Sequence, residues 1–339
     1  MLADGVWGHR RSGARAAREH RTGPQTSWRI SIPTTRTHSA LLRLGTRGSA
    51  LARAQAALVH EALVGRHPAL RVETVYIRTS GDRGEREARA PAGLKGLFVK
   101  EIEDALLAGE IDVGVHSMKD LPARLPAGLV VGAVPARAAA HDVLIGAPGL
   151  RELPPGARVG TASVRRRAQL LARRPDLAVT PLRGNVDTRL RRWREGAIDA
   201  LVLAAAGLER LGIAEPAAHA LAPEEFLPPV GQGALALECR ADAAPTRALL
   251  AAVEDRAAAT AVAAERAFLL AIGGDCNTPL AAHATVADGR VTLRALVTDQ
   301  DGRRWLEEAG SAPAADAEAL GRALAEGLLV AGAREILGG

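Results

Sequence analysis

Three lysines stand out in a chain that otherwise uses arginine for its positive charge. Of 44 basic residues, only Lys95, Lys100 and Lys119 are lysines, and all three lie within a stretch of 25 residues. An ammonium is a compact, flexible point charge, whereas a guanidinium is a planar fork, so the cluster indicates a site that needs a point charge. Asp120 follows Lys119 directly. A carboxylate at this place can exchange a proton or stabilise a developing cation, and the stretch is therefore the candidate active site.

Asp120 comes shortly after an apolar segment, 111–115, that is predicted to be a buried strand. Ligands of open α/β sheets bind beyond the carboxyl ends of such strands, which favours a role at a site. The alternative is that Asp120 caps a helix beside Lys119. A metal site is not predicted, because His116 has no second His or Cys at ligand spacing.

Two halves of the chain repeat the same pattern. Residues 44–49 contain Gly-Thr-Arg-Gly-Ser and residues 159–163 contain Gly-Thr-Ala-Ser, and each segment precedes a helical run with an Arg-Ala-Gln triplet. The two helical runs are followed by the predicted strands 72–78 and 178–182. Strand, turn, helix and strand in this order are typical of a parallel sheet covered by helices.

The serine of each turn stands where a helix N-cap belongs, and exposed backbone N–H groups there attract anions. Arg47 flanks the first turn, Arg165, Arg166 and Arg167 follow the second, and the segment 183–189 brackets a Gly-Asn turn with two more arginines. Such forks suit a ligand with several carboxylates. The simpler alternative to an anion site is that the serines only cap their helices and the arginines only form surface salt bridges.

The pattern changes from about residue 253 onward. The spacing predicts a helix over 257–271, a Gly-Gly loop, two strands over 283–286 and 291–297, and a last helix over 316–331. This order predicts a small α+β third domain with an antiparallel sheet.

The two cysteines stand in different contexts. Cys239 lies in a strand-like apolar run and is predicted to be a buried packing residue. Cys276 lies in the turn-forming loop 273–279, where a thiol can act as a nucleophile or an attachment point, or can be inert. Neither context fits a disulfide framework, so a reducing, cytoplasmic location is expected.

The formal charge of +6 is concentrated in one place. Residues 1–38 hold seven arginines and two acids, which leaves the body of the chain nearly neutral. With a single tyrosine, Tyr76, the body lacks a stacking platform for nucleic acid. No apolar run is long enough for a membrane span. Residues 1–38 are predicted to be disordered; a transit peptide, a start assigned too far upstream and a nonessential extension all fit them.

From about Leu41 to the C-terminus the chain resembles the porphobilinogen deaminase family, also called hydroxymethylbilane synthase. The resemblance is carried by Gly-Leu-Phe-Val-Lys-Glu (96–101), His-Ser-Met-Lys-Asp-Leu-Pro (116–122), Arg-Gly-Asn-Val-Asp-Thr-Arg (183–189), Val-Gly-Gln-Gly-Ala (230–234) and the cysteine loop 273–279. A noncatalytic anion-binding protein and a nucleic-acid-binding protein are the rival interpretations, and these combined motifs speak against both.

The resemblance implies an α/β fold with two similar domains, both like periplasmic binding proteins, and a small α+β C-terminal domain. The hinges are expected near 135–142 and 228–231, with the chain returning to the first domain after the second. The expected division is 1–38 for the basic extension, 39–135 with 233–252 for domain 1, 136–232 for domain 2 and 253–339 for domain 3.

The resemblance also implies an activity. The family is a transferase of heme and tetrapyrrole biosynthesis that joins four porphobilinogen molecules, with loss of ammonia, into the linear hydroxymethylbilane. A dipyrromethane cofactor is expected on Cys276 through a thioether. Asp120 is expected to assist the departure of ammonia and to stabilise the azafulvenium cation, with Lys119 and Arg47 as further catalytic residues. The expected state is a monomer whose product passes to uroporphyrinogen-III synthase.

The resemblance assigns the remaining site residues by motif. The cofactor is expected to contact Lys95, Ser117, Asp120, Thr161, Ser163, Arg165 and Arg166, and the substrate or growing chain is expected to contact Arg47, Ser49, Phe98, Arg183, Arg189 and Gln232. Two positions depart from the family pattern. Ala162 replaces a frequent serine, and Pro91 stands where some members carry a basic residue, which puts one cofactor contact in doubt.

Overall fold

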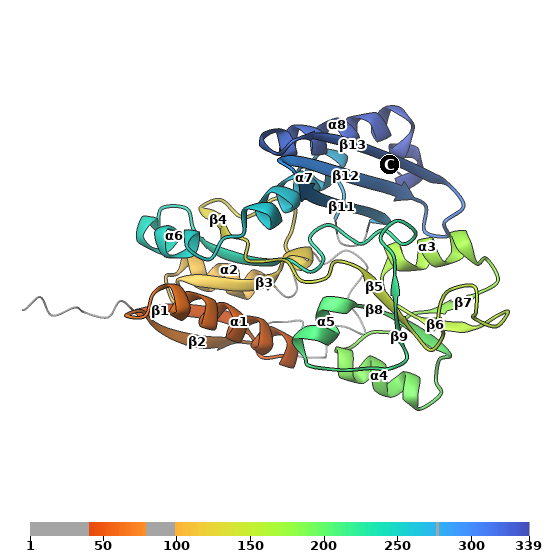
Figure 1. The fold of residues 1–339 in the computed structure, drawn as a ribbon, viewed down its shortest axis with the longest axis horizontal. Coiled ribbons are helices and arrows are strands. Elements are labelled where there is room, and N and C mark those ends of the chain that lie inside the picture. The colour runs from red at the N-terminus through yellow and green to blue at the C-terminus, as the bar shows by residue number, and fades with distance from the viewer. Residues whose placement is uncertain (1–40, 79–98, 276–277, 339) are drawn as a thin grey trace, which may run out of the picture. The chain divides into compact units, whose positions relative to one another are not determined.

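The computed structural model describes residues 41–78, 99–275 and 278–338. Within these ranges the strands form two five-stranded sheets and one three-stranded sheet, which we call sheets 1, 2 and 3 (Figure 1). Each sheet has its own helices and its own apolar core. The predicted basic extension, residues 1–38, lies outside the described residues.

Sheet 1 has the strand order β2-β1-β3-β10-β4. Its strands are β1 (Leu41–Arg47), β2 (Arg71–Ile77), β3 (Val113–Ser117), β4 (Leu129–Ala133) and β10 (Leu235–Arg240), and its helices are α1 (Ala50–Arg66), α2 (Lys100–Leu107) and α6 (Ala244–Ala251).

Sheet 2 has the order β7-β6-β8-β5-β9, so the two sheets correspond strand by strand. Its strands are β5 (Asp142–Ile145), β6 (Arg158–Gly160), β7 (Ala178–Thr180), β8 (Ala200–Ala204) and β9 (Ala218–Leu221), and its helices are α3 (Val164–Arg173), α4 (Val186–Arg194) and α5 (Ala205–Arg210).

The strand–turn–helix–strand units are parallel as predicted, since β1 pairs parallel with β2 and β6 pairs parallel with β7, but each sheet also contains a strand of opposite direction. β10 runs antiparallel to both β3 and β4, and β5 runs antiparallel to both β8 and β9. A parallel neighbour requires a crossover connection, usually a helix. β10 enters sheet 1 only after the chain has returned from sheet 2, so no crossover within sheet 1 sets its direction.

The duplication predicted from the sequence is present in the structure. In sheet 1, Arg43 of β1 donates from its backbone N, its Nε and its Nη2 to the carboxylate of Asp112. In sheet 2, Arg158 of β6 makes the same three contacts to Asp199. The strand registers agree, because β1 pairs with β3 at Leu44–Val113 and β6 pairs with β8 at Val159–Ala200.

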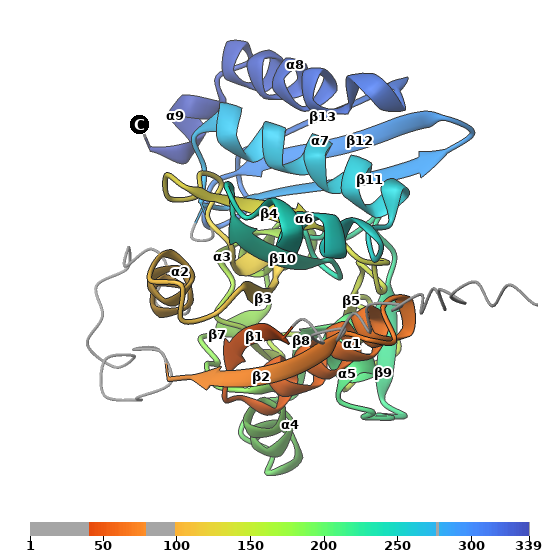
Figure 2. The same cartoon turned by 90° about the vertical axis from the view of Figure 1, so that its left-hand side faces the viewer.

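Sheet 3 is antiparallel and consists of β11 (Leu280–Ala287), β12 (Arg290–Thr298) and β13 (Trp305–Pro313). Helices α7 (Arg256–Ile272) and α8 (Ala317–Val330) pack against each other and against this sheet (Figure 2). A short helix, α9 (Ala333–Leu337), follows. The sequence predicted the two long helices and the first two strands, but β13 and α9 were missed.

The predicted domain boundaries stay predictions. They are supported by β10, which lies between β3 and β4, and by α6, which contacts both β4 and β10. Among the helices of the described ranges, none is long and apolar enough to cross a membrane.

Candidate active site

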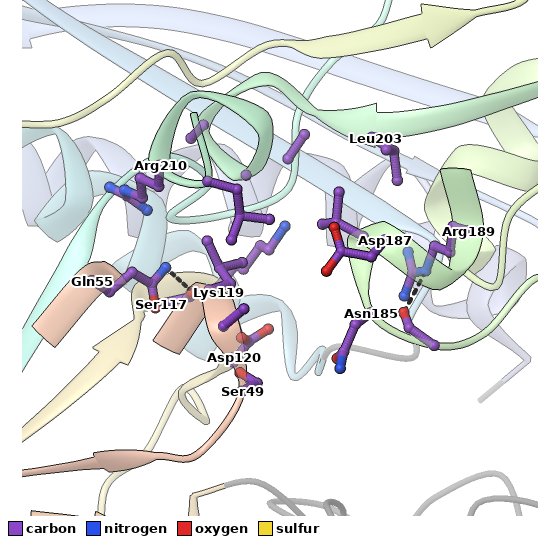
Figure 3. Close-up of a pocket in the computed structure, with 18 of the residues that line it drawn as sticks. Ser49, Gln55, Ser117, Lys119, Asp120, Asn185, Asp187, Arg189, Leu203 and Arg210 are labelled. Atoms are coloured by element: carbon purple, nitrogen blue, oxygen red, sulfur yellow. Dashed lines mark hydrogen bonds between the residues drawn. The ribbon is translucent and has the colours of Figure 1, made fainter. Parts of the chain in front are cut away.

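A cavity of about 590 Å³ is lined by residues that follow the strands of sheets 1 and 2 (Figure 3). Its polar and charged lining residues are Arg47, Ser49, Gln55, Ser117, Lys119, Asp120, Arg166, Arg183, Asn185, Asp187, Thr188, Arg189 and Arg210. Six of these are cationic and two are acidic, so the cavity favours an anionic ligand.

The sheet 1 wall is built around the end of β3. This strand was predicted at 111–115 and is observed at Val113–Ser117, followed by a 3₁₀ turn at Met118–Asp120. Met118 is buried, which anchors the turn and leaves Lys119 and Asp120 at the cavity. Ser117 Oγ accepts a hydrogen bond of 2.8 Å from Gln55 of α1, which joins the turn to the helix.

Gly231 lets the returning chain approach this turn closely. Its φ is +72°, and a Cβ there would lie 2.5 Å from the Cγ of Met118. A larger residue would therefore displace the segment that carries Asp120, and its backbone would be strained as well.

Lys119 is the amine on the sheet 1 side of the cavity. Its side chain donates a hydrogen bond of 3.2 Å to Gln232 Oε1. Burial and the nearby Arg166 guanidinium lower the pKa of Lys119 to about 8, although Asp120 and Asp142 act in the opposite direction. An amine with this pKa is present in both protonation states near neutral pH, so it can take part in proton transfer.

Helices α1 and α3, which begin beside the cavity, have serine N-caps, as the repeat predicted. Ser49 accepts from Ala52 N at the start of α1, and Ser163 accepts from Arg166 N at the start of α3. Thr161 is buried, and its hydroxyl accepts from Ser163 N, which shapes the turn. Thr161 and Ser163 are not among the lining residues, whereas Ser49 is.

Arg165 and Arg166 are buried, and they share one counter-ion. Arg165 Nη2 lies 2.6 Å from one carboxylate oxygen of Asp142, and Arg166 Nη2 lies 2.7 Å from the other. Their Nη1 atoms donate to the carbonyl oxygens of Leu227 and Val202. Arg166 lines the cavity and Arg165 does not.

Gln232 is fully buried and connects the two walls. Its amide donates 2.7 Å to Ala140 O and 2.8 Å to Asp142 Oδ1, while its oxygen accepts from Lys119. Gln232 does not line the cavity, so its predicted contact with substrate stays a prediction.

The turn before α4 forms the far wall. Gly184 has a φ of +111°, and its carbonyl accepts 2.7 Å from Arg189 Nε, which folds the arginine back over the turn. Arg183 and Asn185 are exposed at the cavity. The first turn of α4 and these side chains together offer N–H donors to an anion.

Three predicted site residues, Lys95, Phe98 and Cys276, lie outside the described residues, as does Pro91. The flanks of the cysteine loop are described. α7 ends at Gly273 in the left-handed conformation, and Asp275 N donates 2.8 Å to the hydroxyl of Thr278. Hydrogen bonds therefore join Asp275 to Thr278, the described residues on either side of 276–277.

Sequence reasoning missed some lining residues. Gln55 belongs to the repeated Arg-Ala-Gln triplet, which was noted without a role. Arg210, at the end of α5, donates 2.5 Å to Gly233 O, and burial lowers its pKa. No motif marks Arg210, and only the fold brings it to the cavity.

The described part of the chain holds no group of three or more His, Cys, Asp or Glu that could bind a metal.

The fold and the cavity together define an α/β protein whose two larger sheets border a cavity suited to a small polyanion, with a carboxylate and an amine at its side. Comparisons with known proteins identify the family. Residues 42–248 match the model described as "Porphobilinogen deaminase, dipyromethane cofactor binding domain", and residues 259–330 match "Porphobilinogen deaminase, C-terminal domain". The chain belongs to the porphobilinogen deaminase family.

Similar proteins carry the same name. Porphobilinogen deaminase of Syntrophotalea carbinolica is 51% identical over 301 residues, which cover 88% of this chain and 96% of that protein. The enzyme of Desulforudis audaxviator is 51% identical over 296 residues, which cover 87% and 96%. Among solved structures, the periplasmic aliphatic sulphonate binding protein SsuA of Escherichia coli matches with a TM-score of 0.38 and 17% identity, over 68% of this chain and 70% of that one.

The activity follows from the family. The chain is a transferase that condenses four porphobilinogen molecules head to tail, with loss of ammonia, to hydroxymethylbilane in tetrapyrrole biosynthesis. Its cofactor is dipyrromethane.

Proposed function

We propose that Asp120 is the carboxylate that assists the loss of ammonia in this condensation. The observation that carries the proposal is its position, at the end of β3 on a cavity that also exposes Lys119 and Arg166. Loss of ammonia from porphobilinogen leaves a positive charge on the pyrrole. A fixed carboxylate stabilises such a charge better than water does, because its orientation costs no reorganisation.

Lys119 and Arg47 complete the catalytic group in this proposal. With a pKa of about 8, Lys119 can hold or release a proton at the amine that departs. Arg47 ends β1 and lines the cavity beside the cap of α1. Its guanidinium is suited to a substrate carboxylate.

The residues present fit the dipyrromethane cofactor. Each of its two pyrroles carries two carboxylates, and the cavity has an excess of cationic side chains. Arg166 lines the cavity, and its buried Nε has no hydrogen-bond partner in the structure, so a donor is available to an anion. When bound, the group supplies the pyrrole end to which the first substrate is joined.

We assign the binding residues accordingly. The cofactor would be held by Lys95, Ser117, Asp120, Thr161, Ser163, Arg165 and Arg166. Substrate and growing chain would be held by Arg47, Ser49, Phe98, Arg183, Arg189 and Gln232. The cationic turn before α4 supports the second set, because the growing chain gains two carboxylates with each pyrrole.

Cys276 is the proposed attachment point. Cys239 is a poor alternative, because it is fully buried in β10 and burial raises the pKa of its thiol. Intact-protein mass measurement followed by peptide mapping tests the assignment. We expect an adduct of two pyrroles on Cys276, an inactive unmodified Cys276→Ala variant, and a modified, active Cys239→Ala variant. An adduct on any other residue, or an active enzyme without one, would contradict the proposal.

We further propose a cytoplasmic monomer that passes its product to uroporphyrinogen-III synthase. Light scattering during size-exclusion chromatography measures the mass in solution, and a stable dimer would refute the monomeric state.

Deletion of residues 1–38 is expected to leave turnover intact, since the family match starts at residue 42.

A further inference from the structure

Asp142, the first residue of β5, is a fully buried carboxylate to which no motif assigned a role. It receives two guanidinium groups at 2.6 and 2.7 Å and the amide of Gln232 at 2.8 Å. The two guanidinium groups hold the pKa of Asp142 well below its usual range despite the burial, so it is ionised.

The fold does not require an ion pair at this place, as the first half of the chain shows. The strand registers place Leu235 of β10 at the position of Asp142, since Leu235 pairs with Ser117 and Asp142 pairs with the equivalent Ala204. Counting from the N-caps Ser49 and Ser163, Leu51 and Ala52 take the places of Arg165 and Arg166. The same framework is therefore built with apolar side chains in sheet 1.

Two contacts connect Asp142 to the cavity. One is direct, because the Arg166 guanidinium that contacts Asp142 belongs to a residue that lines the cavity. The other passes through Gln232, whose amide donates to Asp142 while its oxygen accepts from Lys119. The contact of the amide NH₂ with Asp142 fixes which end of Gln232 faces Lys119.

We propose that Asp142 is a positioning residue for the deaminase reaction, which fixes the Arg166 guanidinium at the cavity wall and, through the Gln232 amide, orients the Lys119 ammonium. The proposal rests on the functions proposed above for Lys119 and Arg166. Asp142 itself does not line the cavity.

Charge predicts what loss of Asp142 does to Lys119. The charged groups that act on Lys119 are Arg165 and Arg166, which oppose its protonation, and Asp120 and Asp142, which favour it. Asp142→Asn removes one favourable charge and leaves both opposing ones in place. The pKa of Lys119 should therefore fall from about 8, by about one pH unit. The inflection in the activity profile moves to lower pH whether Lys119 acts as acid or as base.

The scarcity of lysine makes a direct test practical. Holoenzyme labelled with ¹³Cε-lysine has three labelled side chains, Lys95, Lys100 and Lys119. Lys95→Arg and Lys100→Arg variants assign the signals, and titration then reports the Lys119 ammonium itself. This readout is independent of turnover and of cofactor chemistry.

Four variants separate positioning from simple stability. Asp142→Asn should fold, lower the Lys119 inflection and reduce kcat/KM at least tenfold, and Asp142→Glu should restore part of both. Gln232→Met leaves the pairs of Asp142 with Arg165 and Arg166 in place and should lower the inflection by itself. Asp199→Asn is the matched control, because it removes an exposed Arg–Asp contact from the same sheet and should change neither quantity.

The outcomes are decisive. An unchanged Lys119 titration and unchanged kcat/KM in folded Asp142→Asn would overturn the inference. If Asp142→Asn does not fold, an unchanged titration in Gln232→Met would overturn it instead. A separate experiment tests the proposed function. Normal turnover of the Asp120→Asn enzyme would refute the catalytic role proposed for Asp120, whatever the Asp142 variants show.

Discussion

Sheets 1 and 2 share one framework, yet they bury opposite kinds of charge. Sheet 1 encloses acids: Glu238 of β10 is fully buried with its Oε2 3.0 Å from His116 Nε2, and Glu103 of α2 lies nearby. Sheet 2 encloses an excess of cations, Arg165 and Arg166 around the single Asp142. The capped helices and the Arg–Asp contacts are common to both sheets. The same framework can therefore carry different buried charges.

The difference suits the reaction. The substrate and the growing chain are polyanions, but the reacting carbon becomes positive when ammonia leaves. Sheet 1 brings the acid Asp120 to the cavity, and sheet 2 brings Arg166, Arg183 and Arg189. Most carboxylates of the growing chain are thus expected on the sheet 2 side, with the reacting carbon facing sheet 1, where Arg47 can hold a carboxylate of the incoming substrate.

The largest effect is expected at Asp120. Asp120→Asn keeps the size of the side chain and removes its charge, so turnover should fall by about a thousandfold even when the cofactor is attached. Asp120→Glu keeps the charge one methylene away and should retain measurable turnover. Steady-state formation of hydroxymethylbilane, after cofactor loading is verified by mass, measures both. Near-normal turnover of the Asn variant would show that Asp120 only caps the turn.

The arginines of sheet 2 should divide into two groups. Arg165→Leu and Arg166→Leu should impair cofactor loading, whereas Arg183→Leu and Arg189→Leu should load normally and stall during elongation, with kcat/KM lower by about a hundredfold. Mass analysis of the enzyme–intermediate complexes separates the groups. If all four variants load fully and accumulate the same intermediates, the division is refuted.

A pH effect on stability is expected in sheet 1. Burial and the charge of Glu238 raise the pKa of Glu103 to about 7, from an ordinary value of 4.5. Between these values the folded state keeps a proton that the unfolded chain releases, so stability falls as pH rises through this window. Glu103→Gln should remove this fall, and at pH 8 it should be more stable than wild type by about 2 kcal/mol.

Urea unfolding at pH 5 and pH 8 measures the effect, with the exposed Glu110→Gln as the control. Equal pH dependence in Glu103→Gln and wild type would show that Glu103 ionises normally in the folded protein.

The smallest effects are expected at the repeated Arg–Asp contacts. Asp112 is 16% exposed and Asp199 is 40% exposed, so the same Asp→Asn change should cost more in sheet 1. Asp112→Asn should lower the free energy of unfolding by about 1 kcal/mol, and Asp199→Asn by less. Urea midpoints of the two variants test the order, and a larger loss at Asp199 would contradict it.

Local signals in the sequence predicted the local features correctly. The Gly-Thr turns with their serines predicted both helix caps, the apolar run predicted that Cys239 is buried, and the strand before Asp120 predicted where Asp120 emerges. These features depend on residues close in the chain, whose spacing is visible directly.

What the sequence did not predict depends on distant residues. Asp142 and Arg165 are 23 residues apart, and no pattern in either segment predicts their contact. β13 was missed because its polar and small residues lack strand alternation, and its pairing with β12 defines it. The antiparallel direction of β10 is likewise set by the route of the chain between the sheets.

The position of β10 has a consequence for synthesis on the ribosome. In sheet 1, β3 and β4 do not pair with each other; both pair with β10, which ends at Arg240. All of sheet 2 is translated before that strand. A nascent chain that has emerged only to residue 135 therefore carries two strands with unpaired edges, and such edges are where newly made chains associate wrongly. Sheet 1 cannot be completed until β10 has been translated. Pauses in translation between residues 135 and 240 should therefore lower the yield of folded protein.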